Sequence, residues 1–301
     1  MDNIIIKVKY IKLLVFDLKN KKLKNSLSKV LNIWIRGFLM NILKEVKEFY
    51  NSYPYPLQKI ENIKDLFYKK HKTTMKNILY CADLAQEDLK NIKILDAGCG
   101  TGEKALYFSY YKAKVDAFDI SKNSIKIAKK NAKKLKLKVN YFVDSFENFS
   151  CSKRYDLIIA IGSLHHSSEP KKNFLKLSKF LKPKGVIVIG LYSFYGRISC
   201  QIARFILKHI FKDRKKAFEF LVKILKLKTT TAKMLIADRY LSPFELNHTI
   251  SEVLNWIKEA KLIPFRIVPK SGFTKLDIIK LELRLLLTQR GFFFISAKKQ
   301  D

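Results

Sequence analysis

The sequence predicts an α/β protein with a Rossmann-like, mostly parallel sheet, and two features support that prediction. Five short apolar runs alternate with amphipathic segments between residues 91 and 192, and a glycine-rich turn follows the first run. Strands buried on both faces of a parallel sheet have this apolar character, and segments with helical periodicity connect them. Two apolar runs near the C-terminus add two more strands. The predicted strands cover residues 92–98, 114–120, 139–144, 155–162, 185–192, 264–269 and 291–297.

Helices are expected between the strands. Ile125, Ala128 and Ala132 recur at helical spacing, and Ser121 precedes them as a residue type favoured at the N-cap. A second helix is expected over residues 174–181, where the apolar positions show the same spacing before a proline and a glycine.

The chain divides into four parts by composition. Residues 1–45 form a basic N-terminal extension, and residues 46–90 form a lid and helical segment. A core of residues 91–192 is completed by residues 261–301. Residues 193–260 show amphipathic helices and no strand signal, which predicts a helical insertion after the fifth strand.

The composition is strongly basic. Lys and Arg number 60 against 26 Asp and Glu, giving a formal net charge of +34, which favours phosphates, anionic lipid head groups or acidic substrates. Only nine of these 60 residues are Arg, and an A+T-rich genome produces the same excess of Lys, Ile and Asn. The charge alone therefore does not identify a partner.

Cysteine usage and the N-terminus favour a cytoplasmic protein. The four cysteines form no CxxC pair, so neither a zinc site nor a disulfide framework is predicted. Lys7, Lys9 and Lys12 interrupt the first apolar stretch, which argues against a signal peptide. The apolar run of about 14 residues over 30–43 is too short to span a bilayer, which needs about 20.

The stretch ILDAGCGTGE, residues 94–103, predicts a ligand site. Gly98 and Gly100 follow a buried strand and permit close approach of a ligand to the backbone. The spacing lacks the last step of a GxGxxG dinucleotide motif, and Asp96 suits a cationic ligand better than a pyrophosphate. A second interpretation of Asp96 is an acid that braces the loop.

Acidic residues also end the second and third predicted strands. Asp119 lies about 20 residues after the glycine turn, where a carboxylate can bind both hydroxyls of a ribose. Asp144 closes the third strand beside Ser145 and Phe146, where an adenine could donate its amine and stack.

Together these motifs resemble the class I S-adenosylmethionine-dependent methyltransferases. The resemblance rests on ILDAGCGTGE, FDIS at 118–121, VDSFEN at 143–148, YDLIIAIGSLHH at 155–166 and LKPKGVIVIG at 181–190. It implies a seven-stranded sheet in the order 3-2-1-4-5-7-6 with the last strand antiparallel, and S-adenosylmethionine as cofactor. The cofactor-binding residues that it implies are Asp96, Gly98, Gly100, Asp119, Ile120, Asp144, Ser145 and Ala160. Lys104, at a helix start, departs from the charge expected there.

His165 and His166 follow the fourth strand and are the candidate catalytic residues. An imidazole there could remove a proton from the acceptor, the molecule that receives the methyl group. Either histidine could instead brace the loop. No third ligand stands at a supporting spacing, so no metal site is predicted.

The acceptor-side candidates lie in the lid and the insertion. FYNSYPYP at 49–56 contains two prolines that impose a rigid turn, and the insertion carries GLYSFYGR at 190–197 and DRYLSPFELNHTISEVLNWIKEA at 238–260. These segments resemble bacterial methyltransferases of unassigned substrate. The acceptor-binding candidates are Tyr50, Tyr53, Tyr55, Arg197, Tyr240 and His248. We expect His165, His166, Tyr240 and His248 to border one cavity, and SPFE to start a helix with Ser242 as N-cap.

The acceptor class is narrowed by what the fourth strand lacks. It has no Asn/Asp-Pro-Pro-Tyr/Phe clamp and no cysteine nucleophile, features that the resemblance associates with methylation of nucleic-acid bases. A small-molecule, quinone-like or lipid acceptor is therefore predicted. Two alternatives stay open: an RNA-binding protein or RNA methyltransferase that uses the basic surface, and a peripheral membrane enzyme with basic amphipathic helices over 201–227.

Overall fold

The computed structural model describes residue 37 and residues 39–301. Most of the predicted N-terminal extension therefore lies outside the described residues.

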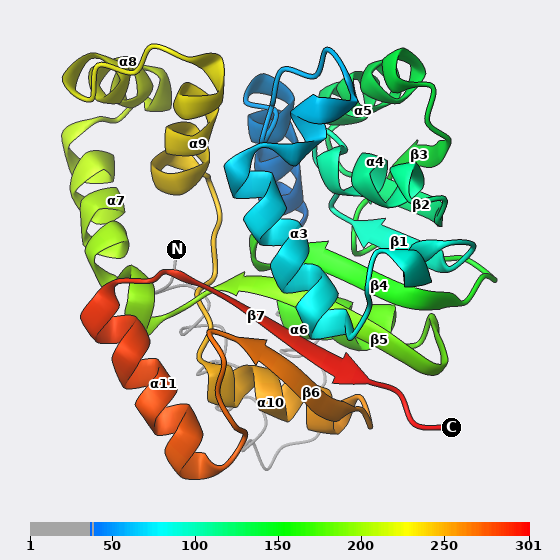
Figure 1. Ribbon diagram of the computed structural model, residues 1–301. Coiled ribbons are helices and arrows are strands. Elements are labelled where there is room, and N and C mark those ends of the chain that lie inside the picture. The colour runs from blue at the N-terminus through cyan, green and yellow to red at the C-terminus, as the bar shows by residue number, and fades with distance from the viewer. Residues whose placement is uncertain (1–36, 38) are drawn as a thin grey trace, which may run out of the picture.

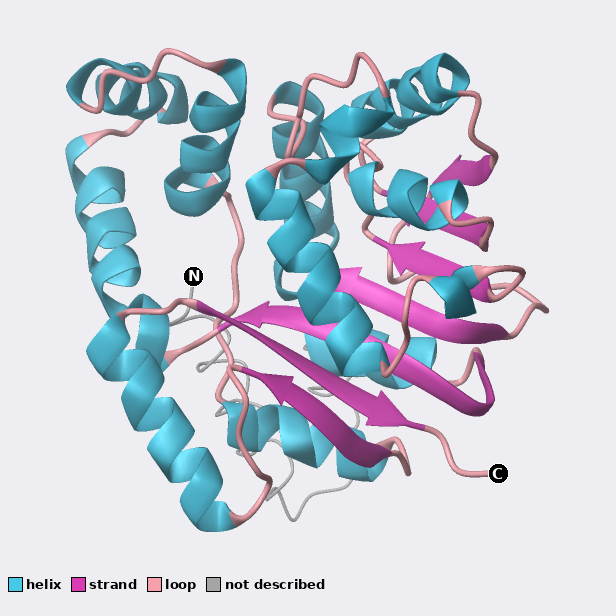
Figure 2. Ribbon diagram, in the orientation of Figure 1, coloured by secondary structure: helices cyan, strands magenta, loops and turns pink. Residues whose placement is uncertain are grey.

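Seven strands form one sheet in the order β3-β2-β1-β4-β5-β7-β6, and β7 runs antiparallel to both of its neighbours (Figures 1 and 2). This order confirms the predicted fold. The strands are β1 (Lys93–Ala97), β2 (Lys114–Asp119), β3 (Val139–Val143), β4 (Tyr155–Ile161), β5 (Leu181–Tyr192), β6 (Ile263–Val268) and β7 (Phe292–Lys298).

The central strands are buried on both faces. On β4, Leu157 and Ile159 join one apolar core while Ile158 and Ala160 join the other, as the alternation of side chains along a strand requires. Side chains of α3, α4 and α5 complete the first core, and those of α6, α10 and α11 complete the second. These six helices are α3 (Lys69–Ala82), α4 (Glu103–Tyr110), α5 (Lys122–Leu135), α6 (Pro170–Ser178), α10 (Ile250–Glu259) and α11 (Lys275–Thr288).

The helix predictions hold in part. Ser121 caps α5 by accepting a hydrogen bond from the backbone N–H of Ser124 at 3.1 Å, as predicted. The helix expected over 174–181 is wrong at its end, since α6 stops at Ser178. The reason is strand pairing: the Phe180 carbonyl accepts a hydrogen bond from the Tyr155 N–H at 2.9 Å, which starts β5 earlier than predicted.

The predicted helix start at Ser242 is also wrong. Helix α10 begins at Ile250, and the Thr249 hydroxyl caps it. The Ser242 hydroxyl is used elsewhere, because it donates to the Phe244 carbonyl at 3.1 Å and lies 3.2 Å from Nδ1 of His166. No helix begins over residues 242–249, and the Ser242 hydroxyl makes these tertiary contacts instead.

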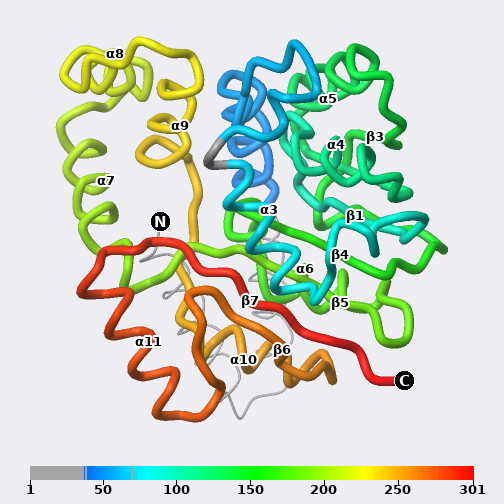
Figure 3. The backbone as a smooth tube through the Cα atoms, in the orientation of Figure 1, coloured from blue at the N-terminus to red at the C-terminus, as the bar shows by residue number. Residues whose placement is uncertain are grey.

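After β5 the chain forms three helices before it returns to the sheet. They are α7 (Ile198–Ile210), α8 (Arg214–Ile224) and α9 (Thr230–Leu241). The connection from α9 to α10 passes the end of β5 (Figure 3), where the N–H of His248 donates to the Tyr192 carbonyl at 2.9 Å. This return brings residues near 240 beside the histidines that follow β4. Four short 3₁₀ helices complete the structure: η1 (Ile63–Phe67), η2 (Glu87–Leu89), η3 (Leu164–His166) and η4 (Tyr195–Arg197).

Candidate functional site

A cavity of about 870 Å³ lies at the carboxyl ends of the parallel strands. This is where ligands bind in open α/β sheets, and the volume is near the upper end of the roughly 300–1,000 Å³ typical of ligand pockets. Its walls come from the ends of β1 to β5, the start of β7, α3, α9 and the helix over residues 39–52. The predicted site residues that line it are Tyr50, Tyr55, Gly98, Gly100, Asp119, Ile120, Asp144, Ser145, His166 and Arg197.

The glycine loop requires glycine at two positions. Gly98 and Gly100 have positive φ angles of 72° and 56°. A Cβ on Gly98 would lie 2.3 Å from the Cβ of Ser163, and one on Gly100 would lie 2.2 Å from the Tyr55 carbonyl oxygen. Larger residues would therefore displace the loop from β4 or from the Tyr55 backbone.

Asp119 ties the glycine loop to the end of β2. One carboxylate oxygen accepts a hydrogen bond from the N–H of Gly100 and the other from the N–H of Ser121, both at 2.9 Å. Burial raises the pKa of Asp119, while these two N–H groups favour its ionised form. The carboxylate is thus held in position at the cavity wall.

The end of β3 supplies the next part of the wall. The N–H of Ser145 donates to the Asp144 carboxylate at 2.8 Å, and both residues line the cavity. The ring of Phe146 also lines it and meets Phe118 edge to face at 5.4 Å between centroids. An aromatic ring beside a carboxylate provides the stacking surface and the acceptor that a purine amine needs.

Asp96 and Ala160 do not line the cavity. Ala160 is part of the core. Asp96 is fully buried, and within the described part of the chain neither of its oxygens has a hydrogen bond of good geometry. Its nearest cation is the Lys104 ammonium at 3.8 Å, and Lys104 itself lines the cavity. Burial raises the pKa of Asp96 to about 6, although the Lys104 charge acts in the opposite direction.

These residues fit S-adenosylmethionine. No described atom lies within 4 Å of the position that a Cβ on Gly162 would take, so open space faces the backbone at the end of β4. The Asp96 carboxylate, which has an ion pair with Lys104 but no hydrogen-bond partner among the described residues, provides buried negative charge behind the glycine loop, as suits a cationic methionine portion. Asp119 presents a fixed carboxylate for a ribose at the neighbouring strand end.

The lid segment lies on the glycine loop. The carbonyl of Tyr55 accepts a hydrogen bond from the N–H of Thr101 at 3.2 Å, and the hydroxyl of Thr101 accepts one from the N–H of Leu57 at 3.1 Å. Tyr50 and Tyr55 line the cavity. Tyr53 does not, because its ring packs 5.1 Å from that of Phe218 in α8.

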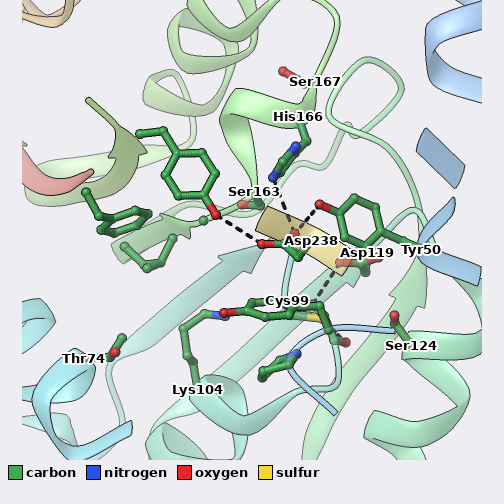
Figure 4. A pocket seen from close by; sticks show the side chains of 18 of the residues that line it. Tyr50, Thr74, Cys99, Lys104, Asp119, Ser124, Ser163, His166, Ser167 and Asp238 are labelled. Carbon is green, nitrogen blue, oxygen red and sulfur yellow. Dashed lines mark hydrogen bonds and ion pairs between the residues drawn. The ribbon is translucent and has the colours of Figure 1, made fainter. Parts of the chain in front are cut away.

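His166 is buried at the cavity wall, and one of its ring nitrogens has no hydrogen-bond partner among the described residues. Its Nδ1 lies 2.8 Å from the Phe244 carbonyl oxygen, which can only accept, so Nδ1 carries the proton of the neutral ring. Its Nε2 has no hydrogen-bond partner among the described residues and lies 3.8 Å from a carboxylate oxygen of Asp238 (Figure 4). A buried imidazole with one unpaired nitrogen therefore lies at the cavity wall beside Asp238.

Asp238 is a central residue that sequence reasoning missed. Its carboxylate accepts hydrogen bonds from the Tyr50 hydroxyl at 2.7 Å and the Tyr192 hydroxyl at 3.1 Å, and only 5% of the residue is exposed. Figure 4 shows Tyr50, His166 and Asp238 pointing toward one another. Burial and the Asp238 charge raise the pKa of both tyrosines, so both remain protonated donors. The sequence feature that could have pointed to Asp238 is the cluster of polar and aromatic residues that follows it, including Arg239 and Tyr240.

The four residues expected to border one cavity do not all do so. Only His166 among them lines it. The ring of His165 is fully buried 4.0 Å from that of Tyr192, and burial lowers its pKa well below the usual value, so it stays neutral. His248 pairs with Glu252 at 3.1 Å, and Tyr240 packs with the cluster around α8 and α9.

Arg197, a predicted acceptor-binding residue, lies at the cavity wall. It is 4% exposed, and its guanidinium stands 3.5 Å from the centroid of the Tyr192 ring, where a cation–π contact forms. Glu245 pairs with it at 3.0 Å. A fixed cation therefore borders the acceptor end of the cavity.

The raised pKa of Asp96 predicts a measurable pH dependence of stability. The folded-state pKa of about 6 exceeds the unfolded value of about 3.9, so the folded state binds this proton more tightly. Proton binding by Asp96 makes its full contribution to the free energy of unfolding below about pH 4. That contribution is lost as the pH rises through 6. In urea titrations, wild type relative to Asp96→Asn should lose about 2 kcal/mol of unfolding free energy between about pH 4.5 and about pH 7. A difference that stays constant with pH would contradict the assignment.

Comparisons with known proteins agree with this geometry. A family model described as "Methyltransferase domain" matches residues 88–260, more than half of the chain. The ubiquinone biosynthesis O-methyltransferase of Pelagibacter ubique (strain HTCC1062) is 37% identical over 106 residues, 35% of this chain and 44% of that protein. The protein of the same name from Rickettsia bellii (strain OSU 85-389) is 32% identical over 103 residues, 34% of this chain and 43% of that protein. The chain spans less than half the length of these curated relatives.

Solved structures share the fold at lower identity. PKMT2 from Rickettsia typhi in complex with AdoHcy has a TM-score of 0.55 at 19% identity, covering 75% of this chain and 52% of that one. Magnesium protoporphyrin IX methyltransferase from Synechocystis PCC 6803 with bound SAM has a TM-score of 0.54 at 12% identity, covering 86% and 97%. Because the matching family model spans the glycine loop, Asp119 and the residues after β4, the chain belongs to the class I S-adenosylmethionine-dependent methyltransferases.

Proposed function

We propose that this methyltransferase acts on a hydroxyl group of a small-molecule acceptor of the quinone-like or lipid class. The observation that carries the proposal is the unpaired Nε2 of His166, a residue that lines the cavity beside Asp238. A hydroxyl is a weak nucleophile until it loses its proton, so a fixed base in the acceptor part of the cavity suits this chemistry.

The chain supplies the base and its support. Nε2 of His166 takes the acceptor proton while the Phe244 carbonyl holds the Nδ1 proton and fixes the ring orientation. Asp238, 3.8 Å from Nε2, then stabilises the charged imidazolium. S-adenosylmethionine supplies an electrophilic methyl group, and the remaining task of the protein is to align the acceptor oxygen with it.

The acceptor side is built by the lid and by residues 193–260. Aromatic rings of Tyr50, Tyr55, Tyr192 and Phe292 line the cavity with the guanidinium of Arg197. Such walls suit a flat, oxygenated ring, because aromatic faces stack on it and a cation attracts its oxygens. The curated relatives, whose names describe O-methyl transfer in ubiquinone biosynthesis, support the same class.

Product analysis tests the proposal. The full chain is incubated with S-adenosylmethionine and, separately, with catechols, a hydroxylated quinol carrying an isoprenoid tail, a primary amine of similar size, and a structured RNA. We expect an O-methylated catechol or quinol by mass spectrometry, with equal release of S-adenosylhomocysteine. Methylation confined to the amine or the RNA, by a protein that binds the cofactor, would contradict a hydroxyl acceptor.

A further inference from the structure

Large apolar side chains are exposed on three helices of the insertion and the C-terminal segment. Figure 1 shows α7, α8 and α11 along the side of the molecule away from β3. The exposed fractions of these side chains range from 42% to 75%. They are Ile202, Phe205, Ile206 and Ile210 on α7, Phe220, Ile224 and Leu225 at α8, and Leu276, Ile279, Leu283 and Leu287 on α11. We call these eleven residues and their three helices the apolar edge.

Their spacing shows that they form stripes rather than scattered single residues. On α7 the four residues recur at intervals of three, one and four, which places them on one side of a helix. On α11 the intervals are three, four and four, with the same consequence. The Ser199 hydroxyl donates to the Gln289 side chain at 2.8 Å, so the start of α7 adjoins the end of α11. Stripes of exposed apolar side chains on adjoining helices are typical of an interaction site.

The charge around α7 and α8, together with their exposed apolar side chains, favours an anionic partner. Residues 198–228 carry nine Lys or Arg and only two acids, Asp213 and Glu219. Apolar side chains surrounded by lysines match the interface of an anionic bilayer, where the side chains enter the acyl boundary and the ammonium groups meet lipid phosphates. A second copy of this chain would bring equal positive charge to the contact, because the net charge is +34.

The cavity reaches the surface at this edge. Arg239 and Gln289 line the cavity and are exposed, and Gln289 contacts the first turn of α7. Arg197 and Gly291 line the cavity next to them. An acceptor with a long apolar tail could therefore lie in the cavity with its ring while its tail stays in the bilayer.

We propose that the apolar edge docks the enzyme on the surface of an anionic phospholipid bilayer. None of the helices in the part of the chain that the structure describes is long and apolar enough to cross a membrane, and the geometry is that of an interfacial contact. The docking depends only on the exposed side chains and their charge. Delivery of a lipophilic acceptor from the bilayer to the cavity rests, in addition, on the proposed function.

Vesicle flotation tests the docking without cofactor or acceptor. The full chain is mixed with vesicles of phosphatidylcholine alone or of phosphatidylcholine with phosphatidylglycerol. We expect binding to the phosphatidylglycerol vesicles, weakened by added salt, and little binding to phosphatidylcholine alone. The double variant Phe205→Ser, Ile206→Ser should reduce the partition coefficient by at least about tenfold, because two large apolar side chains no longer enter the bilayer.

A matched control distinguishes the edge from general hydrophobicity. Tyr110→Ser with Val143→Ser also removes two exposed apolar side chains, on α4 and β3, and should bind vesicles as wild type does. Equal loss in both double variants, no binding by wild type, or conversion of a dimer to a monomer by the Phe205, Ile206 variant in light scattering would overturn the proposal. Methylation of water-soluble catechols is measured in parallel, so that a failure of docking and a failure of the proposed function give different results.

Discussion

His166→Asn is expected to lower the turnover of a hydroxyl acceptor by about 10²- to 10⁴-fold while leaving the affinity for S-adenosylmethionine unchanged. The asparagine amide can still donate to the Phe244 carbonyl, which now receives the Nδ1 proton at 2.8 Å, so the local structure is retained. What is lost is the unpaired Nε2 beside Asp238, the proposed base. Steady-state kinetics and calorimetric titration of the cofactor measure the two quantities.

The control is the same substitution in the neighbouring histidine. His165 lies outside the cavity, so His165→Asn should lower stability without removing the base. A second readout uses acceptors of different acidity, because a phenol that is already ionised in solution does not need a base. His166→Asn should therefore methylate a strongly acidic phenol at close to the wild-type rate. An equal loss on acidic and ordinary phenols would show that His166 is only structural.

Asp119→Ala is expected to weaken binding of S-adenosylmethionine by about 10- to 150-fold, or about 1.5–3 kcal/mol. The carboxylate is positioned to accept hydrogen bonds from the ribose, and it also accepts the N–H groups of Gly100 and Ser121. Without the Asp119 carboxylate, the glycine loop also loses the hydrogen bond that Gly100 donates to the end of β2. Isothermal titration of the cofactor into the folded variant measures the effect.

Asp116→Ala provides the matched control on the same strand. Asp116 is 9% exposed and accepts hydrogen bonds from Asn140 and Tyr155, but it lies outside the cavity lining. Its loss should reduce the free energy of unfolding and leave cofactor affinity within about 0.5 kcal/mol of wild type. Wild-type affinity in a folded Asp119→Ala protein would remove Asp119 from the cofactor site.

Most residues predicted for the cofactor side line one cavity because they are local to strand ends in the sequence. Gly98, Asp119 and Asp144 each stand at or just beyond the end of a strand, and the ends of adjacent parallel strands meet at one edge of a sheet. Apolar runs were sufficient to place those strands, because both faces of the sheet are buried. Motifs at the ends of neighbouring strands therefore lie close together in space once the strand order is known.

The acceptor side could not be predicted in this way, because its residues come from segments far apart in the chain. Tyr50 and Asp238 are separated by 188 positions, and Tyr192 and Asp238 by 46. The direction of each side chain also depends on helix rotation. Asp238 and Tyr240 differ by two residues on α9, about 200° around the axis, so one meets the cavity and the other does not.

By itself the sequence determined the α/β class, the approximate positions of the strands and the glycine loop, since these depend on periodicity and on backbone freedom at particular residues. Only the tertiary structure decided which of two adjacent histidines faces the cavity, and that a buried carboxylate joins Tyr50, Tyr192 and His166. It also decided that the Ser242 hydroxyl caps no helix, because Phe244 and His166 lie within its reach. Such choices depend on long-range packing, in which each side chain is fixed by neighbours that the local sequence does not specify.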